Sequence, residues 1–167
     1  MRRSTTSGGT YRTAALAVLF AGLVTIAGCG STAVDASRDA MPLSVPDVPP
    51  GTELSTAMTE FENGNFGYSA RYFEMAAEQS PKDVTACLGL AASYDWLYRF
   101  DLSDRAYRTC SRIAKDAFSY HNNIGFSYLL RGDYRKASVS FSEAKRLRPG
   151  NPLVETNLRI LRDVSGS

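Results

Sequence analysis

Three cysteines and a single histidine are the side chains with the most distinctive chemistry in this 167-residue chain. Cys29 follows an uncharged run, Cys87 and Cys110 lie further on, and His121 stands alone. A thiolate is a nucleophile and a metal ligand, and two thiols can form a disulfide in an oxidising compartment. No catalytic-triad arrangement, metal-ligand spacing or glycine-rich phosphate loop accompanies these residues in the sequence. The sequence therefore predicts a protein that is not an enzyme and that holds neither a metal nor a cofactor.

The chemistry at Cys29 is defined by the segment before it. Arg2, Arg3 and Arg12 precede the uncharged run 14–27, which is shorter than the ~20 residues of a spanning helix and has the length of a secretory signal. The run ends in Ile26-Ala27-Gly28-Cys29, which resembles the lipobox of bacterial lipoproteins. That resemblance implies a signal peptide at 1–28 and a diacylated Cys29 as the first mature residue. An uncleaved inner-membrane anchor is the alternative.

Residues 29–52 are interpreted as the lipidated cysteine and a tether. They lack helical periodicity and contain four prolines, namely Pro42, Pro46, Pro49 and Pro50. By resemblance to lipoproteins, Gly30 and Ser31 in place of an aspartate after the cysteine favour the outer membrane. We therefore expect a lipid-anchored protein whose folded domain, residues 53–167, lies in the periplasm.

A 34-residue repeat organises the rest of the chain. His121, Ile124, Gly125, Tyr128, Ala137, Phe141 and Pro149 resemble the packing frame of a tetratricopeptide repeat. Cys87, Leu90, Ala91, Tyr94, Ser103 and Tyr107 lie one period upstream of the first six. The resemblance implies an all-α, right-handed solenoid of three helix pairs, at about 50–83, 84–117 and 118–151, plus a capping helix at 152–164. The predicted helices are 53–63, 66–79, 83–97, 101–115, 118–131, 134–147 and 152–164.

Small residues and turns explain how these helices would pair. Alanine, glycine and serine recur where antiparallel helices must approach closely, at Ala57, Ser69, Ala91, Ser103, Gly125 and Ala137. Gly64-Asn65 and Gly132-Asp133 would each form a tight turn, glycine taking the positive φ and the next residue capping a helix. The middle repeat has Tyr98-Arg99 in this place, which predicts a distorted turn.

Cys87 and Cys110 would lie on the two helices of the middle pair. They are nearly equidistant from the turn at about residue 99, so the two side chains should face each other. A disulfide is therefore feasible. Two small buried cysteines at packing positions are the alternative.

The first helix of each repeat would line a groove. One face of these helices carries mostly apolar side chains: Leu54, Met58, Phe61, Leu88, Ala92, Asp95, Trp96, Asn122, Phe126, Leu129 and Leu130. Repeat proteins that clamp a C-terminal carboxylate use lysine, arginine and asparagine here, and only Asn122 is similar. The stripe instead favours a bound amphipathic helix. Alternatively, part of it is core or is covered by Met41-Pro42-Leu43 of the tether.

The charge is unevenly distributed. Without residues 1–28 the chain holds 16 basic and 17 acidic residues, so its basic balance comes from the signal and does not indicate nucleic acid. Residues 29–83 carry 3 basic and 9 acidic residues (−6), and residues 84–167 carry 13 and 8 (+5). Either both ends are simply solvated, or the basic end meets an acidic partner or anionic head groups.

The lipobox, the tether and repeats that include the segment 122–137 together resemble the TadD-type lipoproteins of tight-adherence (Flp) pilus systems. The resemblance implies a pilotin: an outer-membrane lipoprotein that binds a helix of a secretin subunit and assists its assembly, with no small-molecule substrate. The alternatives are another lipoprotein of this plan, serving type IVa pili, outer-membrane protein assembly or the cell wall, or a purely structural envelope protein.

Overall fold

The computed structural model describes residues 44–166, and within that range the chain forms seven α-helices and no strand. The helices are α2 (Glu53–Glu62), α3 (Phe66–Gln79), α4 (Val84–Trp96), α5 (Phe100–Ala114), α6 (Phe118–Leu130), α7 (Tyr134–Leu147) and α8 (Pro152–Ser165). Each predicted helix is present, with ends that differ by one residue at most. The signal peptide, Cys29 and most of the tether lie outside the described residues.

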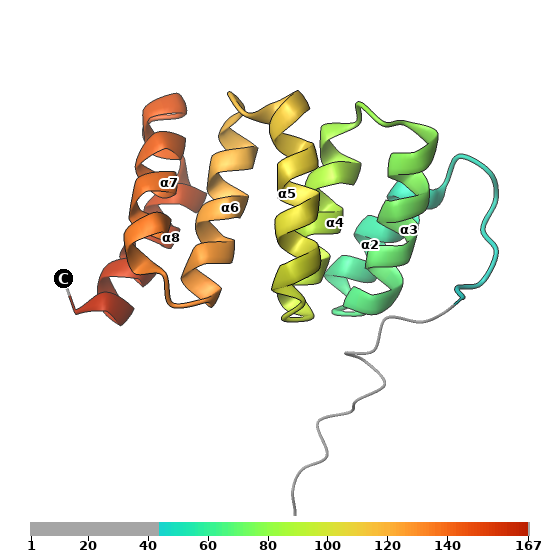
Figure 1. The fold of residues 1–167 in the computed structure, drawn as a ribbon, viewed down its shortest axis with the longest axis horizontal. Coiled ribbons are helices and arrows are strands. Elements are labelled where there is room, and N and C mark those ends of the chain that lie inside the picture. The colour runs from blue at the N-terminus through green and yellow to red at the C-terminus, as the bar shows by residue number, and fades with distance from the viewer. Residues whose placement is uncertain (1–43, 167) are drawn as a thin grey trace, which may run out of the picture. The chain divides into compact units, whose positions relative to one another are not determined.

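The helices pack as consecutive antiparallel pairs. α2 packs on α3, α4 on α5 and α6 on α7, while α3 also packs on α4 and α8 packs on α7. Figure 1 shows the pairs side by side in chain order, with α8 against the last pair. The predicted solenoid of three helix pairs and a capping helix is therefore confirmed.

Small residues lie where the helices of a pair approach most closely. Ala57, Ala91 and Ala137 are completely buried, as are the serines at 69 and 103. Gly125 packs directly against a ring, because a Cβ atom there would lie 2.7 Å from the side chain of Phe141. The small residues of the 34-residue period thus lie where the helices pack tightly.

The turns within the three repeats share one conformation. Gly64 and Gly132 have φ values of 77° and 74°, and Tyr98 occupies the same place with φ 55°. The same two backbone hydrogen bonds close each turn, from Tyr98 N to Asp95 O (3.0 Å) in the middle repeat and from Arg99 N to Tyr94 O (2.9 Å). The distortion predicted for the middle turn does not occur; the tyrosine instead adopts the left-handed conformation that glycine takes elsewhere.

The residues after these glycines differ in their capping role. The Asp133 carboxylate accepts a hydrogen bond from Lys136 N (3.1 Å) and so caps α7 as predicted. Asn65 does not cap α3, because its amide nitrogen donates to Glu60 Oε2 (2.7 Å) of the preceding helix.

The connections between repeats are of two kinds. Ser80 and Arg148 end α3 and α7 in nearly identical extended conformations, with φ −132° and −138° and ψ 77° and 81°. Each precedes a proline, which excludes the helical conformation from the residue before it. Lys115 lacks a following proline and stays helical (φ −55°, ψ −29°) after a longer α5. The end of the second repeat therefore departs from the other two.

The packed part of the chain starts before the predicted boundary at residue 53. Val45 and Val48 are partly buried against the cluster formed by Ala57, Tyr72 and Phe73. The hydroxyl of Tyr72 donates a hydrogen bond to Pro46 O (2.8 Å). The last residues of the tether thus cover the side of the first repeat that no other repeat covers. Among the described residues, no helix is both long enough and apolar enough to span a bilayer.

Candidate functional site

A groove of about 490 Å³ crosses the first helices of all three repeats and ends at α8. Its lining is mostly apolar, and comprises Met58, Phe61, Glu62, Phe73, Val84, Thr85, Leu88, Gly89, Ala92, Asp95, Trp96, Tyr107, Ser119, Asn122, Asn123, Phe126, Leu153 and Asn157. Gly89 forms part of the floor, where a Cβ atom would lie 2.3 Å from the ring of Phe73. Any larger residue at position 89 would therefore clash with the ring of Phe73.

Aromatic rings form a continuous row along one side of the groove. The ring of Trp96 stacks on that of Phe66, with centroids 5.3 Å apart and planes at 8°. Phe61 meets Phe66 edge-on at 5.2 Å, and Phe126 lies 5.8 Å from Trp96. Trp96 remains 37% exposed and Met58 44% exposed. The row joins all three repeats, and three of its rings, those of Phe61, Trp96 and Phe126, line the groove.

The part of the groove away from the aromatic row is lined by polar, uncharged side chains. Asn157 of α8 donates a hydrogen bond from its amide nitrogen to Asn122 Oδ1 (2.9 Å), and both residues are buried. The Asn122 amide nitrogen donates to Asn123 Oδ1 (3.3 Å). Asn122, the one predicted groove residue similar to a carboxylate clamp, is thus hydrogen-bonded to its neighbours and connects α6 with the capping helix.

Asp95 lies at the floor of the groove, but its carboxylate points into the packed interior. The residue is 2% exposed. Its Oδ1 accepts hydrogen bonds from the hydroxyls of Ser103 (2.5 Å) and Ser127 (2.6 Å), and Oδ2 accepts one from Tyr107 (3.0 Å). Three helices, α4, α5 and α6, therefore meet at one carboxylate.

Arg131 supplies the positive charge nearest to this carboxylate. Its Nη2 lies 3.8 Å from Asp95 Oδ1 and donates to Ser127 Oγ (2.7 Å), while Nη1 pairs with Asp104 (2.7 Å). The guanidinium also covers the ring of Phe100 at 4.7 Å. Burial raises the pKa of Asp95 above its ordinary value, against the opposing effect of the three hydroxyl donors and Arg131.

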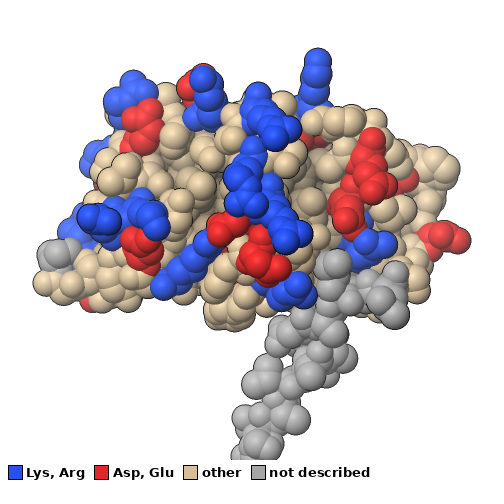
Figure 2. All heavy atoms as spheres, viewed as in Figure 1, with Lys and Arg blue, Asp and Glu red and all other residues tan. Residues whose placement is uncertain are grey.

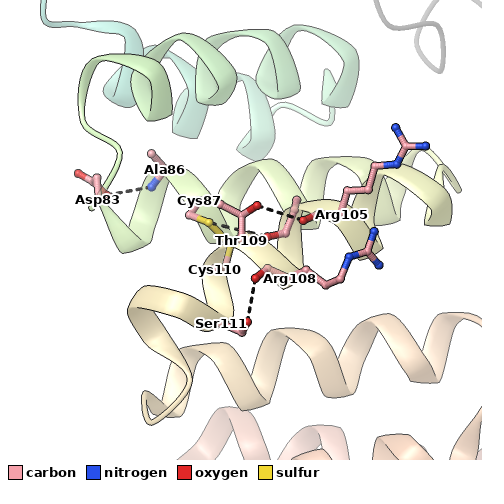
Figure 3. Close-up of a disulfide and its surroundings, with 9 residues drawn as sticks. Asp83, Ala86, Cys87, Arg105, Arg108, Thr109, Cys110 and Ser111 are labelled. Atoms are coloured by element: carbon pink, nitrogen blue, oxygen red, sulfur yellow. Dashed lines mark hydrogen bonds between the residues drawn. A yellow bond between two sulfur atoms is a disulfide. The ribbon is translucent and has the colours of Figure 1, made fainter.

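A disulfide joins Cys87 of α4 to Cys110 of α5. The sulfur atoms are 2.12 Å apart and the Cα atoms 5.7 Å apart. Cys110 is fully buried, and Figure 3 shows the bond between the two helices of the middle repeat. The bridge lies behind the groove wall and fixes the helix that carries Leu88, Ala92 and Trp96.

Comparison with known proteins gives matches among solved structures alone, because no family model and no curated protein matches the chain. The first domain of human RPAP3 is 12% identical, with a TM-score of 0.62, and the match covers 69% of this chain and 91% of that one. The Arabidopsis OM64 domain is 16% identical, with a TM-score of 0.60 and coverage of 68% and 93%. Both are described as TPR domains. The fold is that of a tetratricopeptide-repeat domain.

A third tetratricopeptide-repeat domain of known structure has a bound ligand. It is the first such domain of Spaghetti (RPAP3), solved with the HSP90 peptide SRMEEVD. The domain is 13% identical to this chain, with a TM-score of 0.60 and coverage of 70% and 92%. At this level of identity the likeness shows the fold alone.

The structure brings most of the predicted groove residues of this tetratricopeptide-repeat domain together. Those that line the groove are Met58, Phe61, Leu88, Ala92, Asp95, Trp96, Asn122 and Phe126. Three others lie outside it. Leu54 packs with Val45 and Val48 on the first repeat, Leu129 packs against Leu161 of the cap, and Leu130 is the half-buried last residue of α6.

Sequence reasoning missed residues that come from outside the first helix of each repeat. Phe66 begins α3, yet its ring is part of the aromatic row; Leu153 and Asn157 come from the cap. The 34-residue period offered a signal for Phe66, because Phe100 and Tyr134 occupy the same repeat position. His121 is half-buried with its ring against Tyr120 (5.4 Å). Within the described range, no three His, Cys, Asp or Glu side chains converge as metal ligands would.

Proposed function

We propose that this protein is a lipid-anchored binding scaffold of the bacterial outer membrane that holds an amphipathic helix of a partner protein in its groove. The aromatic row of Phe61, Phe66, Trp96 and Phe126 carries the proposal, because it crosses three repeats and its rings are only partly buried, with Trp96 37% exposed. Exposed apolar surfaces of this kind are typical of binding sites in soluble domains.

The shape and polarity of the groove favour a helix over an extended peptide. One side offers rings and Met58 for apolar side chains at helical spacing. Away from the row, the groove is lined by the side chains of Thr85, Ser119 and Asn123, which could form hydrogen bonds with the polar face of the same helix. A groove that combines the two fits a helix with one apolar and one polar face.

The charge of the groove argues against an acidic ligand such as the SRMEEVD peptide bound by the Spaghetti domain. No lysine or arginine is among the residues that line it, and Glu62 and Asp95 are its charged groups. An incoming carboxylate would find no cation to pair with and would lose its hydration. We therefore infer a neutral or basic helix as the ligand.

The proposed partner is a secretin subunit, with the protein acting as its pilotin in tight-adherence (Flp) pilus assembly. This assignment rests on the resemblance of the lipobox, the tether and the repeats to TadD-type lipoproteins. An acylated Cys29 would keep the domain beside the membrane in which the secretin assembles.

The proposal is tested by replacing the two aromatic residues at the centre of the groove with alanine. Trp96→Ala and Phe126→Ala each remove a ring from the centre of the row, and such anchors commonly contribute at least ~2 kcal/mol, about a 30-fold loss of affinity. Both variants should fail to co-purify with the secretin and should lower the amount of secretin multimers in the outer membrane.

Val139→Ala is the matched control, because Val139 is 68% exposed on α7 and lies outside the groove. Circular dichroism must show that all variants remain helical. If folded groove variants bind the secretin and support multimers at the wild-type level, the proposed mechanism is wrong. If the protein binds a different envelope protein and the same variants lose that binding, the groove is the binding site but the secretin is not its ligand.

The proposed anchor is tested separately. Cys29→Ser should abolish incorporation of radiolabelled palmitate, because the thiol is the acyl acceptor, and should leave an uncleaved or a soluble periplasmic protein whose repeat domain still folds. A variant that still incorporates the label would contradict lipidation at Cys29.

A further inference from the structure

Four cations form a stripe along the outer face of α5. Arg105, Arg108, Arg112 and Lys115 follow one another at intervals of three, four and three residues, which places them on one side of a helix. All four are exposed. The opposite side of α5 carries the buried residues Tyr107 and Cys110. The stripe, defined as these four residues, therefore faces away from the groove.

The stripe is not neutralised by the acidic residues around it. Among the described residues, none forms an ion pair with any of its four cations. Asp101 pairs with Arg99 (3.4 Å) and Asp104 pairs with Arg131 (2.7 Å), so both carboxylates of α5 are engaged elsewhere. Asp116 follows the helix and is the one acidic residue beside the end of the stripe.

The figures show where this charge lies. Figure 2 shows one group of lysine and arginine side chains in the middle of the visible face, where Figure 1 places α5, with acidic side chains beside it and further basic groups on the side of α6 to α8. In Figure 3 the side chains of Arg105 and Arg108 extend away from the helix and from the disulfide. The stripe is thus one part of the basic half of the domain, residues 84–167, and it belongs to the second repeat.

We propose that the stripe binds the anionic phospholipid head groups of the membrane that carries the protein's own anchor. Arginine forms paired hydrogen bonds with phosphate oxygens, and each cation near an anionic surface strengthens binding roughly fivefold. Bound in this way, the domain would rest on α5 with its groove turned toward the partner protein. That the protein lies beside a membrane follows from the proposed lipidation of Cys29. That the stripe can bind phosphate groups follows from its four cations alone.

Two observations favour head groups over an acidic protein. A stable protein interface needs buried apolar or aromatic anchors, and the large exposed apolar residues of the described chain are all outside α5: Met58, Tyr68, Trp96, Tyr98, Tyr134, Val139, Leu153 and Val164. The fifteen residues from Cys29 to residue 44 also span at most about 50 Å when fully extended. A lipid on Cys29 would therefore limit how far residue 44 can move from the membrane.

The experiment measures binding to vesicles without the anchor. The described residues 44–166 belong to one compact unit, and the chain 29–167 carrying Cys29→Ser contains all of them. It should co-sediment with vesicles of phosphatidylcholine and phosphatidylglycerol, but not of phosphatidylcholine alone, and binding should weaken as salt rises. Replacing all three arginines, as Arg105→Gln, Arg108→Gln and Arg112→Gln, should weaken binding on the order of a hundredfold.

A second triple variant distinguishes an effect of the stripe itself from an effect of the protein's net charge. Lys82→Gln, Arg159→Gln and Arg162→Gln remove the same charge from exposed cations outside α5 that are also without ion pairs to described residues. This variant should bind nearly as wild type does. Equal losses in the two triples, or no preference for phosphatidylglycerol, would overturn the proposal, as would binding of poly-glutamate without binding of vesicles. Trp96→Ala should leave vesicle binding unchanged, so failure of the groove and failure of the stripe are distinguishable.

Discussion

The hydroxyl of Ser127 on α6 donates a 2.6 Å hydrogen bond to the Asp95 carboxylate on α4, across the boundary between the second and third repeats. Ser103 and Tyr107 of α5 donate to the same carboxylate. One buried side chain thus connects the middle helix pair with the repeat that follows it, at the floor of the groove.

Removing this acceptor should destabilise the domain strongly. Asp95→Ala leaves three buried hydroxyls without their acceptor and removes one of the two carboxylates near Arg131, so we expect a loss of about 3 kcal/mol or more. Chemical denaturation measures it. Asp104→Ala is the control, because it removes a more exposed partner of the same arginine and should cost about 1 kcal/mol or less.

The raised pKa of Asp95 predicts a pH dependence of stability. Between the ordinary value of 3.8 and the higher folded-state pKa, the folded protein binds more protons than the unfolded chain at this site. The free energy of unfolding contributed by Asp95 therefore falls as pH rises through that window. Wild type minus Asp95→Asn, measured at each pH, isolates this effect. A difference that grows with pH would mean that the folded-state pKa is lowered.

Tyr98 should prefer glycine over alanine. At φ 55° any Cβ atom is disfavoured, so Tyr98→Gly should be more stable than Tyr98→Ala by about 1 kcal/mol. Both variants lose the contact between the rings of Tyr98 and Phe100, which cancels in the comparison. In an ordinary helical position alanine is the more stable of the two, and that order at residue 98 would contradict the observed turn.

Gly125 should not tolerate a methyl group. Gly125→Ala places a Cβ atom 2.7 Å from the fully buried ring of Phe141, and overpacking of this kind costs roughly 1–3 kcal/mol. The helix propensity of alanine offsets about 1 kcal/mol of that cost. Thermal unfolding of Gly125→Ala, Phe141→Leu and the double variant should show that the two changes together cost less than their sum.

The disulfide should stabilise the domain by about 3 kcal/mol, the order expected for a loop of this length. Thiol labelling of the protein, purified and unfolded without reductant, should find Cys87 and Cys110 blocked. Reductant should lower the unfolding midpoint of wild type and leave that of Cys87→Ala with Cys110→Ala unchanged. Free thiols in the unreduced protein would leave both cysteines as packing residues.

The sequence predicts the helix pairs well because their packing recurs at one period. Ala57, Ala91 and Gly125 occupy equivalent places, and each is a small, buried residue in a tightly packed helix pair. The same period explains why counting along one helix face found Leu88, Ala92 and Trp96 correctly as neighbours in the groove.

Contacts between distant segments could not be predicted in this way. Asp95 shares a helix face with Ala92, but its carboxylate is turned inward by hydroxyls that lie 8, 12 and 32 residues further along the chain. Leu129 is in phase with Phe126, yet the cap covers it. Such positions depend on which later segment packs there, and a repeat pattern carries no information about segments outside the repeat.

Each end of the repeat stack is covered by a segment that does not belong to a repeat. Val45 and Val48 pack on the first helix pair, and α8 packs on the last through residues such as Val154 and Leu161. An uncovered end would offer a second molecule the same apolar surface that each repeat offers the next, and copies could then add end to end into filaments. Because segments outside the repeats cover both described ends, neither end offers a free surface on which the repeats of a second molecule could stack.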